Sequence, residues 1–267
     1  MSLLEGVLVV VTAGLFTALV CGIGTLPFFV VDEFSDAITV ALWGLAAGIM
    51  LSASLFGFIF EGLADGTVLQ VGSGLIAGAL LVVGASRVIE GYEFEPGELS
   101  VADTRKLAII IAVLTVHSFP EGVALGVAFA DVGLEGDLVV AGLPIPTLAI
   151  LITVAISIQN IPEGLAVAIP MHTYGTAKWK MFGAAVLTSI PQPIGAAIAF
   201  VFVRIAREFL PFGFGFAAGA MIFLVFRDLI PEALAHGVNL PNGGKRELAI
   251  GFTLGLVTMI PLLFVTV

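Results

Sequence analysis

The sequence predicts an all-α polytopic membrane protein, and its composition and charge are the observations behind that prediction. Of the 267 residues, 59% are apolar and 11% are charged, whereas a soluble domain carries about 25% charged residues. The mean hydropathy is +1.16, which excludes a soluble globular enzyme and a disordered chain. The net charge of −10 excludes a nucleic-acid binder, because no excess of cations can neutralise phosphates. A single cysteine, Cys21, excludes an internal disulfide framework.

Eight stretches are long and apolar enough to cross a membrane, which takes about 20 mostly apolar residues per helix. The breaks between them carry proline, glycine and acidic residues, as turns do, and leave no room for a soluble domain. We therefore expect one transmembrane domain over residues 1–267. The predicted spans are Leu3–Val20, Ile38–Phe60, Val68–Ile89, Leu107–Ala130, Thr147–Ile169, Met181–Ile205, Phe212–Ala235 and Leu248–Val267.

The distribution of lysine and arginine predicts the orientation, because cytoplasmic connections are enriched in these residues. With the N-terminus outside, the inner connections hold seven basic residues and the outer ones only Arg204 and Arg207; Arg227 lies within a span. Both termini are therefore expected outside a cell membrane, either plasma or inner. The first residues lack a basic region, so we expect a retained helix rather than a cleaved signal peptide.

The connections between spans are acidic, with Asp32, Glu33 and Asp36 in the first. These carboxylates can concentrate cations near the ends of a pathway. They can equally be the acidic surface of a protein from a high-salt cytoplasm, which is the interpretation we favour.

Spans four and five carry one motif twice, 42 residues apart: His117-Ser118-Phe119-Pro120-Glu121-Gly122 and Gln159-Asn160-Ile161-Pro162-Glu163-Gly164. His117 and Glu121 are four residues apart, as are Gln159 and Glu163, so each pair shares one helix face. Ionisable residues within a membrane are costly and are therefore functional candidates. The two spans run antiparallel, and each pair lies about 15 Å from the inner end of its helix. The pairs are therefore expected to meet near the middle of the bilayer.

Two carboxylates, an imidazole and an amide carbonyl together suit a divalent cation. Buried carboxylates without a cationic partner hold their protons, so a metal has to displace protons and its binding depends on pH. Pro120 and Pro162 free two helical carbonyls, which a membrane tolerates where a cavity or partner satisfies them. The alternative is that proline and glutamate only kink and join the helices. The matched repeat and the histidine make that alternative weaker.

These motifs resemble those of the ZIP (Zrt- and Irt-like) family of divalent-metal transporters, and the resemblance covers the whole chain. Spans two (Gly44 to Ser54), six (Ser189 to Ala196) and seven (Phe216 to Phe223, then Asp228 and Glu232) are similar to those of its GufA-like branch. The resemblance implies a 3+2+3 arrangement of eight spans, with inverted repeats around spans four and five. It also implies extracellular termini and a homodimer.

The resemblance implies that His117, Glu121, Gln159 and Glu163 are the primary metal ligands, with Met50 as a thioether ligand. For Met50 the alternative is packing alone, the usual role of methionine on an apolar helix. Some family members hold a second metal, and the matching positions are Ser118, Asn160 and Gln192. All three are neutral, so the second site is expected to be weak and one metal well occupied. The histidine-rich segment that the family often has between spans three and four is missing.

A candidate exit path lies on span seven, where Asp228, Glu232 and His236 are spaced four and four and so share a face. His172, just after span five, is expected at the same inner surface. The alternative is that these are ordinary helix-end residues, with Arg227 neutralising Asp228.

We expect uptake of a divalent cation, most of all zinc and also cadmium, iron or manganese, by alternating access around a midplane site. The resemblance also suggests an elevator-like slide. The metal is the substrate, no cofactor is expected, and no ATP-binding loop is found in the sequence. The alternatives are a membrane metal sensor that does not transport, an inactive relative, and an intramembrane metalloenzyme. The absence of a His-Glu-x-x-His run argues against the enzyme.

Overall fold

The computed structural model describes residues 2–30, 35–90, 101–134, 138–140, 142–173 and 175–258. Asp32, Glu33 and the end of the eighth predicted span therefore lie outside the described residues. Within these ranges six helices are long and apolar enough to cross a membrane. They are Leu3–Ile23, Asp36–Asp65, Val68–Val88, Thr147–His172, Lys178–Ile205 and Arg207–His236. A predominantly helical chain with several helices long and apolar enough to cross a membrane is thus confirmed. The fourth and eighth predicted spans fall on two further helices, and their crossing of the membrane stays a prediction.

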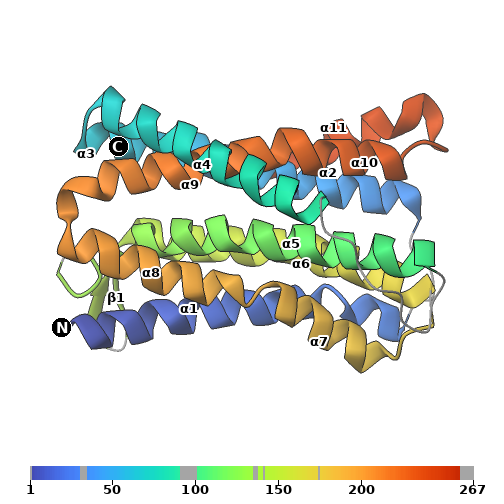
Figure 1. The fold of residues 1–267 in the computed structure, drawn as a ribbon, viewed down its shortest axis with the longest axis horizontal. Helices are drawn as coiled ribbons and strands as arrows, with labels where there is room; N and C mark the ends of the chain where they lie inside the picture. The colour runs from blue at the N-terminus through green and yellow to red at the C-terminus, as the bar shows by residue number, and fades with distance from the viewer. Residues whose placement is uncertain are drawn as a thin grey trace.

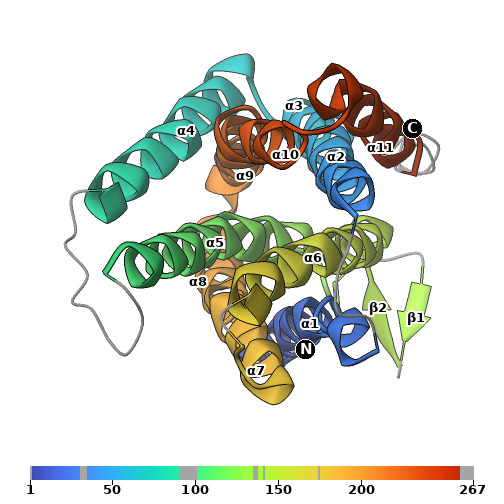
Figure 2. The ribbon, with the colours of Figure 1, turned by 90° about the vertical axis from the view of Figure 1, so that its right-hand side faces the viewer.

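The helices form two groups that lie one above the other in Figures 1 and 2. The lower group contains α1 (Leu3–Ile23), α5 (Val101–Ala128), α6 (Thr147–Thr173), α7 (Lys178–Thr188) and α8 (Pro191–Ile205). The upper group contains α2 (Asp36–Ser52), α3 (Phe60–Asp65), α4 (Val68–Glu90), α9 (Leu210–Leu224), α10 (Ile230–His236) and α11 (Lys245–Thr258). Helices α5 and α6 lie at the boundary, between the upper group and α1, α7 and α8 (Figure 2).

The shorter elements connect these helices. Three are 3-10 helices: η1 (Leu26–Phe29), η3 (Arg207–Phe209) and η5 (Pro241–Gly244). Strands β1 (Leu138–Val140) and β2 (Leu143–Ile145) form an antiparallel hairpin between α5 and α6. Helix α1 begins with a capping box, in which Ser2 and Glu5 each accept a hydrogen bond from the other's backbone N–H.

Three predicted spans are less regular than their apolar runs suggested. A π-helical segment, η2 (Ala53–Ile59), continues α2 into α3, and another, η4 (Val225–Leu229), continues α9 into α10. The sixth span is divided into α7 and α8 at Ser189–Ile190, because Pro191 and Pro193 cannot donate helical hydrogen bonds. A hydropathy profile gives the length of an apolar segment and does not distinguish an α-helix from a π-helix or from a helix break.

Paired Gly-x-x-x-Gly sequences bring two helix pairs of the upper group into backbone contact. A Cβ atom on Gly48 of α2 would lie 2.2 Å from the carbonyl oxygen of Phe252 on α11. One on Gly78 of α4 would lie 2.1 Å from the Phe216 carbonyl oxygen on α9. Such small residues let helices approach closely in a membrane, where packing replaces the hydrophobic driving force. Each partner helix contributes a matching pair, Gly251 and Gly255 on α11, and Gly215 and Gly219 on α9.

In the lower group, too, glycines allow close contact between neighbouring helix backbones. Gly126 of α5 contacts the carbonyl of Ala196 on α8, and Gly24 contacts the carbonyl of Ile161 on α6. Within the helices that the structure describes, we find no such glycine-to-backbone contact between the two groups. Among these glycines, Gly213 of α9 approaches the lower group, and its neighbours there are the side chains of Val127 and Val203. The glycine-to-backbone contacts of the described helices therefore lie within each group.

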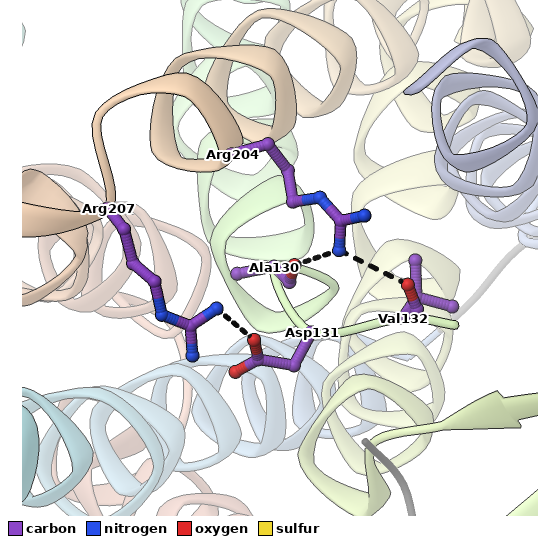
Figure 3. Close-up of polar contacts among 5 residues, drawn as sticks. All are labelled: Ala130, Asp131, Val132, Arg204 and Arg207. Carbon is purple, nitrogen blue, oxygen red and sulfur yellow. Dashed lines mark hydrogen bonds and ion pairs between the residues drawn. The ribbon is translucent and has the colours of Figure 1, made fainter. Parts of the chain in front are cut away.

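Two arginine side chains near the connection from α8 to α9 contact the residues that follow the end of α5 (Figure 3). Arg204 Nη1 donates to the carbonyl oxygens of Ala130 (3.0 Å) and Val132 (3.3 Å). These carbonyls follow the last turn of α5, where helical partners are missing. Arg207, on the short connection between the groups, forms an ion pair with Asp131. Both residues predicted to lie in outer connections therefore hold the same end of the bundle.

We predict that Gly78→Ala destabilises the protein by about 1–3 kcal/mol, because the added methyl group forces α4 away from the α9 backbone. Gly72, on the same helix, has no neighbouring atom within 4 Å of a built Cβ. Gly72→Ala is therefore the matched control, and it should leave stability unchanged or raise it by about 0.4–1 kcal/mol. The measurement is thermal unfolding of the purified protein in detergent, followed by circular dichroism. Equal unfolding temperatures for the two variants would contradict the backbone contact.

Candidate metal site

The two matched motifs lie deep inside the protein on adjacent helices. His117, Glu121, Gln159 and Glu163 are all at most 3% exposed. Pro120 lies inside α5 and Pro162 inside α6, and neither ends its helix. The glycine after each glutamate receives the backbone of another helix: Gly122 contacts the carbonyl of Gln192, and Gly164 that of Cys21. A larger residue at either glycine would push that helix away from the motif.

The structure brings the two motifs into direct contact. Gln159 Nε2 donates a hydrogen bond of 2.8 Å to Glu121 Oε1. The carboxyl groups of Glu121 and Glu163 also lie within hydrogen-bonding contact of each other. The spacing of four residues within each motif therefore does place these side chains on facing helix surfaces.

Several acceptor atoms of this cluster have no hydrogen-bond partner. They are His117 Nδ1, Gln159 Oε1 and Glu163 Oε1. In the described part of the chain only one other buried side-chain atom, on Glu247, shares this property. Buried polar atoms in native proteins are almost always paired. Three unpaired atoms on three neighbouring candidate ligands therefore require an explanation.

Asp228 lies beside the histidine. Its Oδ2 is 3.1 Å from His117 Nε2, and its Oδ1 is 3.7 Å from Arg227 Nε. In the tautomer that protonates Nε2, the ring donates this hydrogen bond to the carboxylate, and Nδ1 carries the lone pair. The structure thus joins a residue predicted for the exit path to one predicted for the primary site.

The other predicted exit-path residues are placed separately. His236 Nε2 is 3.3 Å from Glu232 Oε1, one helical turn away. The His172 ring packs against Phe28 of η1 at a tilt of 35°, with ring centroids 5.0 Å apart. The Arg227–Asp228 proximity anticipated from the sequence is present, and it leaves open both the relay and the helix-end interpretation of these residues.

Met50 is fully buried near the end of α2, which packs against α6. Either role, packing or ligation, requires this placement. Ser118, Asn160 and Gln192, the positions predicted for a weak second site, are also buried. Gln192 Nε2 donates to Glu121 Oε2 at 2.5 Å, so this position contacts the primary cluster.

The cluster is not a closed coordination shell. In the described ranges no three His, Cys, Asp or Glu side chains are grouped closely enough to hold a metal ion. The predicted set has only three residues of these types, and one of them, His117, is bonded to Asp228. Its remaining members, Gln159 and Met50, would contribute an amide oxygen and a thioether.

Sequence reasoning missed Thr17, whose hydroxyl is 2.8 Å from Gln192 Oε1. The hydroxyl of a threonine in an apolar helix often forms a hydrogen bond only with a carbonyl of its own helix. The sequence around Thr17 therefore did not indicate a contact with another helix. The hydrogen bond between His117 and Asp228 was also missed, because the two residues are 111 positions apart.

Comparison with known proteins identifies the family of the chain. Residues 96–262 match the family model described as ZIP zinc transporter. The chain belongs to the ZIP zinc transporter family. Zinc transporter GufA of Myxococcus xanthus is 28% identical over 260 residues, which cover 92% of this chain and 95% of that protein. Zinc transporter ZIPB of Bordetella bronchiseptica is 35% identical over 233 residues, covering 82% of this chain and 69% of that protein.

A putative zinc transporter of Arabidopsis thaliana is 37% identical over 226 residues, 83% of this chain. The match covers 34% of that plant protein, so the chain spans about a third of its length. The ZIP family consists of transporters, so the expectation that the chain is a transporter rather than an enzyme is confirmed. The resemblance found from the paired motifs is confirmed as well.

Proposed function

We propose that the chain carries zinc across the cell membrane into the cytoplasm, through a site between α5 and α6. The ligands are His117, Glu121, Gln159 and Glu163, and Met50 completes them. The observation that carries this proposal is the set of three buried acceptor atoms without a donor. A divalent cation is bound by nitrogen and oxygen lone pairs alike, so it suits all three atoms.

The free-energy cost of unpaired buried acceptors also supports a bound cation. Each buried acceptor left without a partner costs about 1–3 kcal/mol. A bound divalent cation would remove that cost at His117 Nδ1, Gln159 Oε1 and Glu163 Oε1 together. Imidazole nitrogen, oxygen and thioether ligands favour zinc or cadmium and admit iron or manganese, with availability deciding among them in the cell.

Asp228 has a second role in this proposal. Histidine ligands to metals commonly donate their other ring N–H to a carboxylate, which fixes the tautomer and the ring orientation. The hydrogen bond from His117 Nε2 to Asp228 matches that arrangement and leaves Nδ1 for the metal. While zinc is bound at the site, Asp228 positions His117. When zinc leaves the site, the Asp228 carboxylate is the neighbouring group that can bind it next.

The proposed topology is eight crossings in a 3+2+3 arrangement, with both termini outside. Helix pairing supports the inverted repeats: α4 pairs with α9, and α11 pairs with α2. Helices α4 and α9 belong to spans three and seven, and α11 and α2 belong to spans eight and two. If span two corresponds to span seven and span three to span eight, the two pairs are equivalent. The π-helical segments η2 and η4 also lie in spans that correspond in this way. Helix α1 begins at the end of the molecule toward which α11 runs (Figure 1).

The proposed mechanism is alternating access, in which one helix group moves against the other. Close glycine-to-backbone contacts join helices within each group, and the described glycines make none across the boundary. Such an interface can change register without breaking helix pairs, as transporters with inverted repeats require. A homodimer remains part of the proposal on the strength of the sequence resemblance.

We predict that Glu163→Gln abolishes saturable zinc uptake into proteoliposomes, since the variant replaces a carboxylate ligand with a neutral amide. Glu208→Gln, an exposed residue of the connection between the groups, is the matched control and should transport normally. Uptake by Glu163→Gln equal to that of the control would refute the site. Tight zinc binding without any uptake by the unmodified protein would instead favour the metal-sensor alternative.

We predict that Asp228→Leu weakens zinc binding about 10–100-fold, the usual cost of losing a carboxylate behind a histidine ligand. Asp228→Asn retains an oxygen that accepts from His117, so its loss should be smaller. Isothermal titration with zinc in detergent measures both, with Asp36→Asn, an exposed residue at the start of α2, as the control. Equal affinities for the leucine and asparagine variants would show that the hydrogen bond does not position the histidine.

A further inference from the structure

Arg227 is a positive charge inside a candidate membrane span, the apolar helix Arg207–His236. About 14 Å of helix separate it from His236 at the end of that span, at a rise of 1.5 Å per residue. A charge at such a depth is costly, so an ionisable residue there is a functional candidate. The Arg227 side chain is 26% exposed, so most of it lies against the protein.

The guanidinium of Arg227 lies beside the Asp228 carboxylate. Arg227 Nε is 3.7 Å from Asp228 Oδ1, which is close enough for an ion pair and too long for a hydrogen bond. Arg227 Cζ lies 5.9 Å from the centre of the Phe223 ring, about one helical turn earlier, where a cation–π attraction acts on it. The guanidinium is therefore kept near this carboxylate oxygen without a hydrogen bond between Nε and Oδ1.

Asp228 lies between two cationic or potentially cationic groups that come from different parts of the bundle. Its Oδ2 is 3.1 Å from His117 Nε2 on α5, in the lower group. Its Oδ1 faces Arg227 in η4, which connects α9 and α10 of the upper group. The contact with the histidine is the shorter of the two. In this arrangement the carboxylate is bonded to the zinc ligand, and the arginine is its looser partner.

The backbone at Arg227 and Asp228 is also unusual. The N–H of Ile230 bonds to the carbonyl of Val225, five residues earlier, and π turns of this kind are frequent at functional sites. Adjacent side chains of a regular α-helix do not face each other. Within η4, however, the adjacent Arg227 and Asp228 bring opposite charges within ion-pair distance. An arginine and a carboxylate are thus placed together next to the proposed metal site.

Two cations compete for the Asp228 carboxylate when zinc leaves the primary site. Zinc bound to Asp228 would lie close to the guanidinium, and repulsion between cations is strong where little water screens it. Without a cation beside it, a carboxylate in this region would hold a divalent ion more tightly. Arg227 therefore lowers the affinity of Asp228 for zinc.

We propose that Arg227 is a tethered competitor for Asp228, which prevents this carboxylate from retaining zinc and so speeds release of the ion toward the cytoplasm. The inference rests on the proposed function, because Asp228 must be the group that zinc meets when it leaves His117. Arg227 acts on the ion through Asp228 and is a positioning residue.

The first test removes the charge of the competitor. We predict that Arg227→Gln binds zinc about tenfold more tightly, within the usual range for coupling between two ligands of one protein. The KM and the maximal rate of zinc uptake should both fall, because the ion is held longer. Arg227→Lys keeps the charge and should remain close to the unmodified protein. Isothermal titration with zinc in detergent measures the affinity, and uptake into proteoliposomes measures the KM and the rate.

Arg246→Gln is the matched control for the loss of one positive charge. Arg246 is exposed in the first turn of α11, and the variant should keep the affinity and the uptake rate of the unmodified protein. Tighter zinc binding by this control as well would show a general effect of net charge and would overturn the competitor role of Arg227.

The second test combines two substitutions. In the Asp228→Asn background, Arg227→Gln should no longer raise the zinc affinity, because the carboxylate for which the two cations compete is absent. An equal rise in both backgrounds would show that Arg227 acts on zinc by another route and would overturn the proposal.

The sign of the affinity change separates this role from the alternatives. Weaker zinc binding by folded Arg227→Gln would show that the arginine supports the bond between Asp228 and His117. A lower uptake rate with unchanged affinity would show a structural role, and no change at all would show that Arg227 has no part in release. Each of these results overturns the proposal. If Arg227→Gln does not fold, Arg227→Met, which keeps a long unbranched side chain, is measured in its place.

The proposed function is tested separately. If the unmodified protein takes up zinc and Glu163→Gln does not, that function stands whatever the Arg227 variants show. Absence of both zinc uptake and zinc binding in the unmodified protein would refute the function itself.

Discussion

The structure depends on the burial of two glutamates, Glu121 and Glu163, in the middle of an apolar helix bundle. A carboxylate without a partner is costly in such a place. Each polar residue around them contributes to meeting that cost. Amide groups donate to Glu121, while His117 Nδ1 and Gln159 Oε1 have no hydrogen-bond partner. The surplus of acceptors over donors is what distinguishes the site from an ordinary polar network that ties helices together.

The architecture around the glutamates follows from small residues. Glycines leave room for the backbone of another helix beside both motifs, at Gly122 and Gly164. In a membrane no water is expelled when helices associate, so close van der Waals contact has to stabilise the pairs. In the described helices these glycine contacts lie within each group and not between the groups.

Much of this could be predicted from the sequence, and the rest could not for physical reasons. The spacing of four residues between His117 and Glu121 fixed a shared helix face, and the repeat of the motif indicated that a second helix faces it. Helix geometry is local, so such inferences hold. The hydrogen bonds of Asp228 to His117 and of Thr17 to Gln192 depend on helices distant in the chain. No local pattern encodes them. The π-helical segments were missed because they have the same hydropathy as α-helix.

The connection that carries Arg207 sets a mechanical limit. Only four residues, 206–209, separate the last residue of α8 from the first of α9, and they join the two helix groups. Four residues reach at most about 14 Å when fully extended, and these are coiled into a 3-10 turn with Arg207 paired to Asp131. The other connections between the groups contain more residues. Under the proposed alternating access, the two groups can therefore separate least at this end of the bundle, and the longer connections permit more displacement elsewhere.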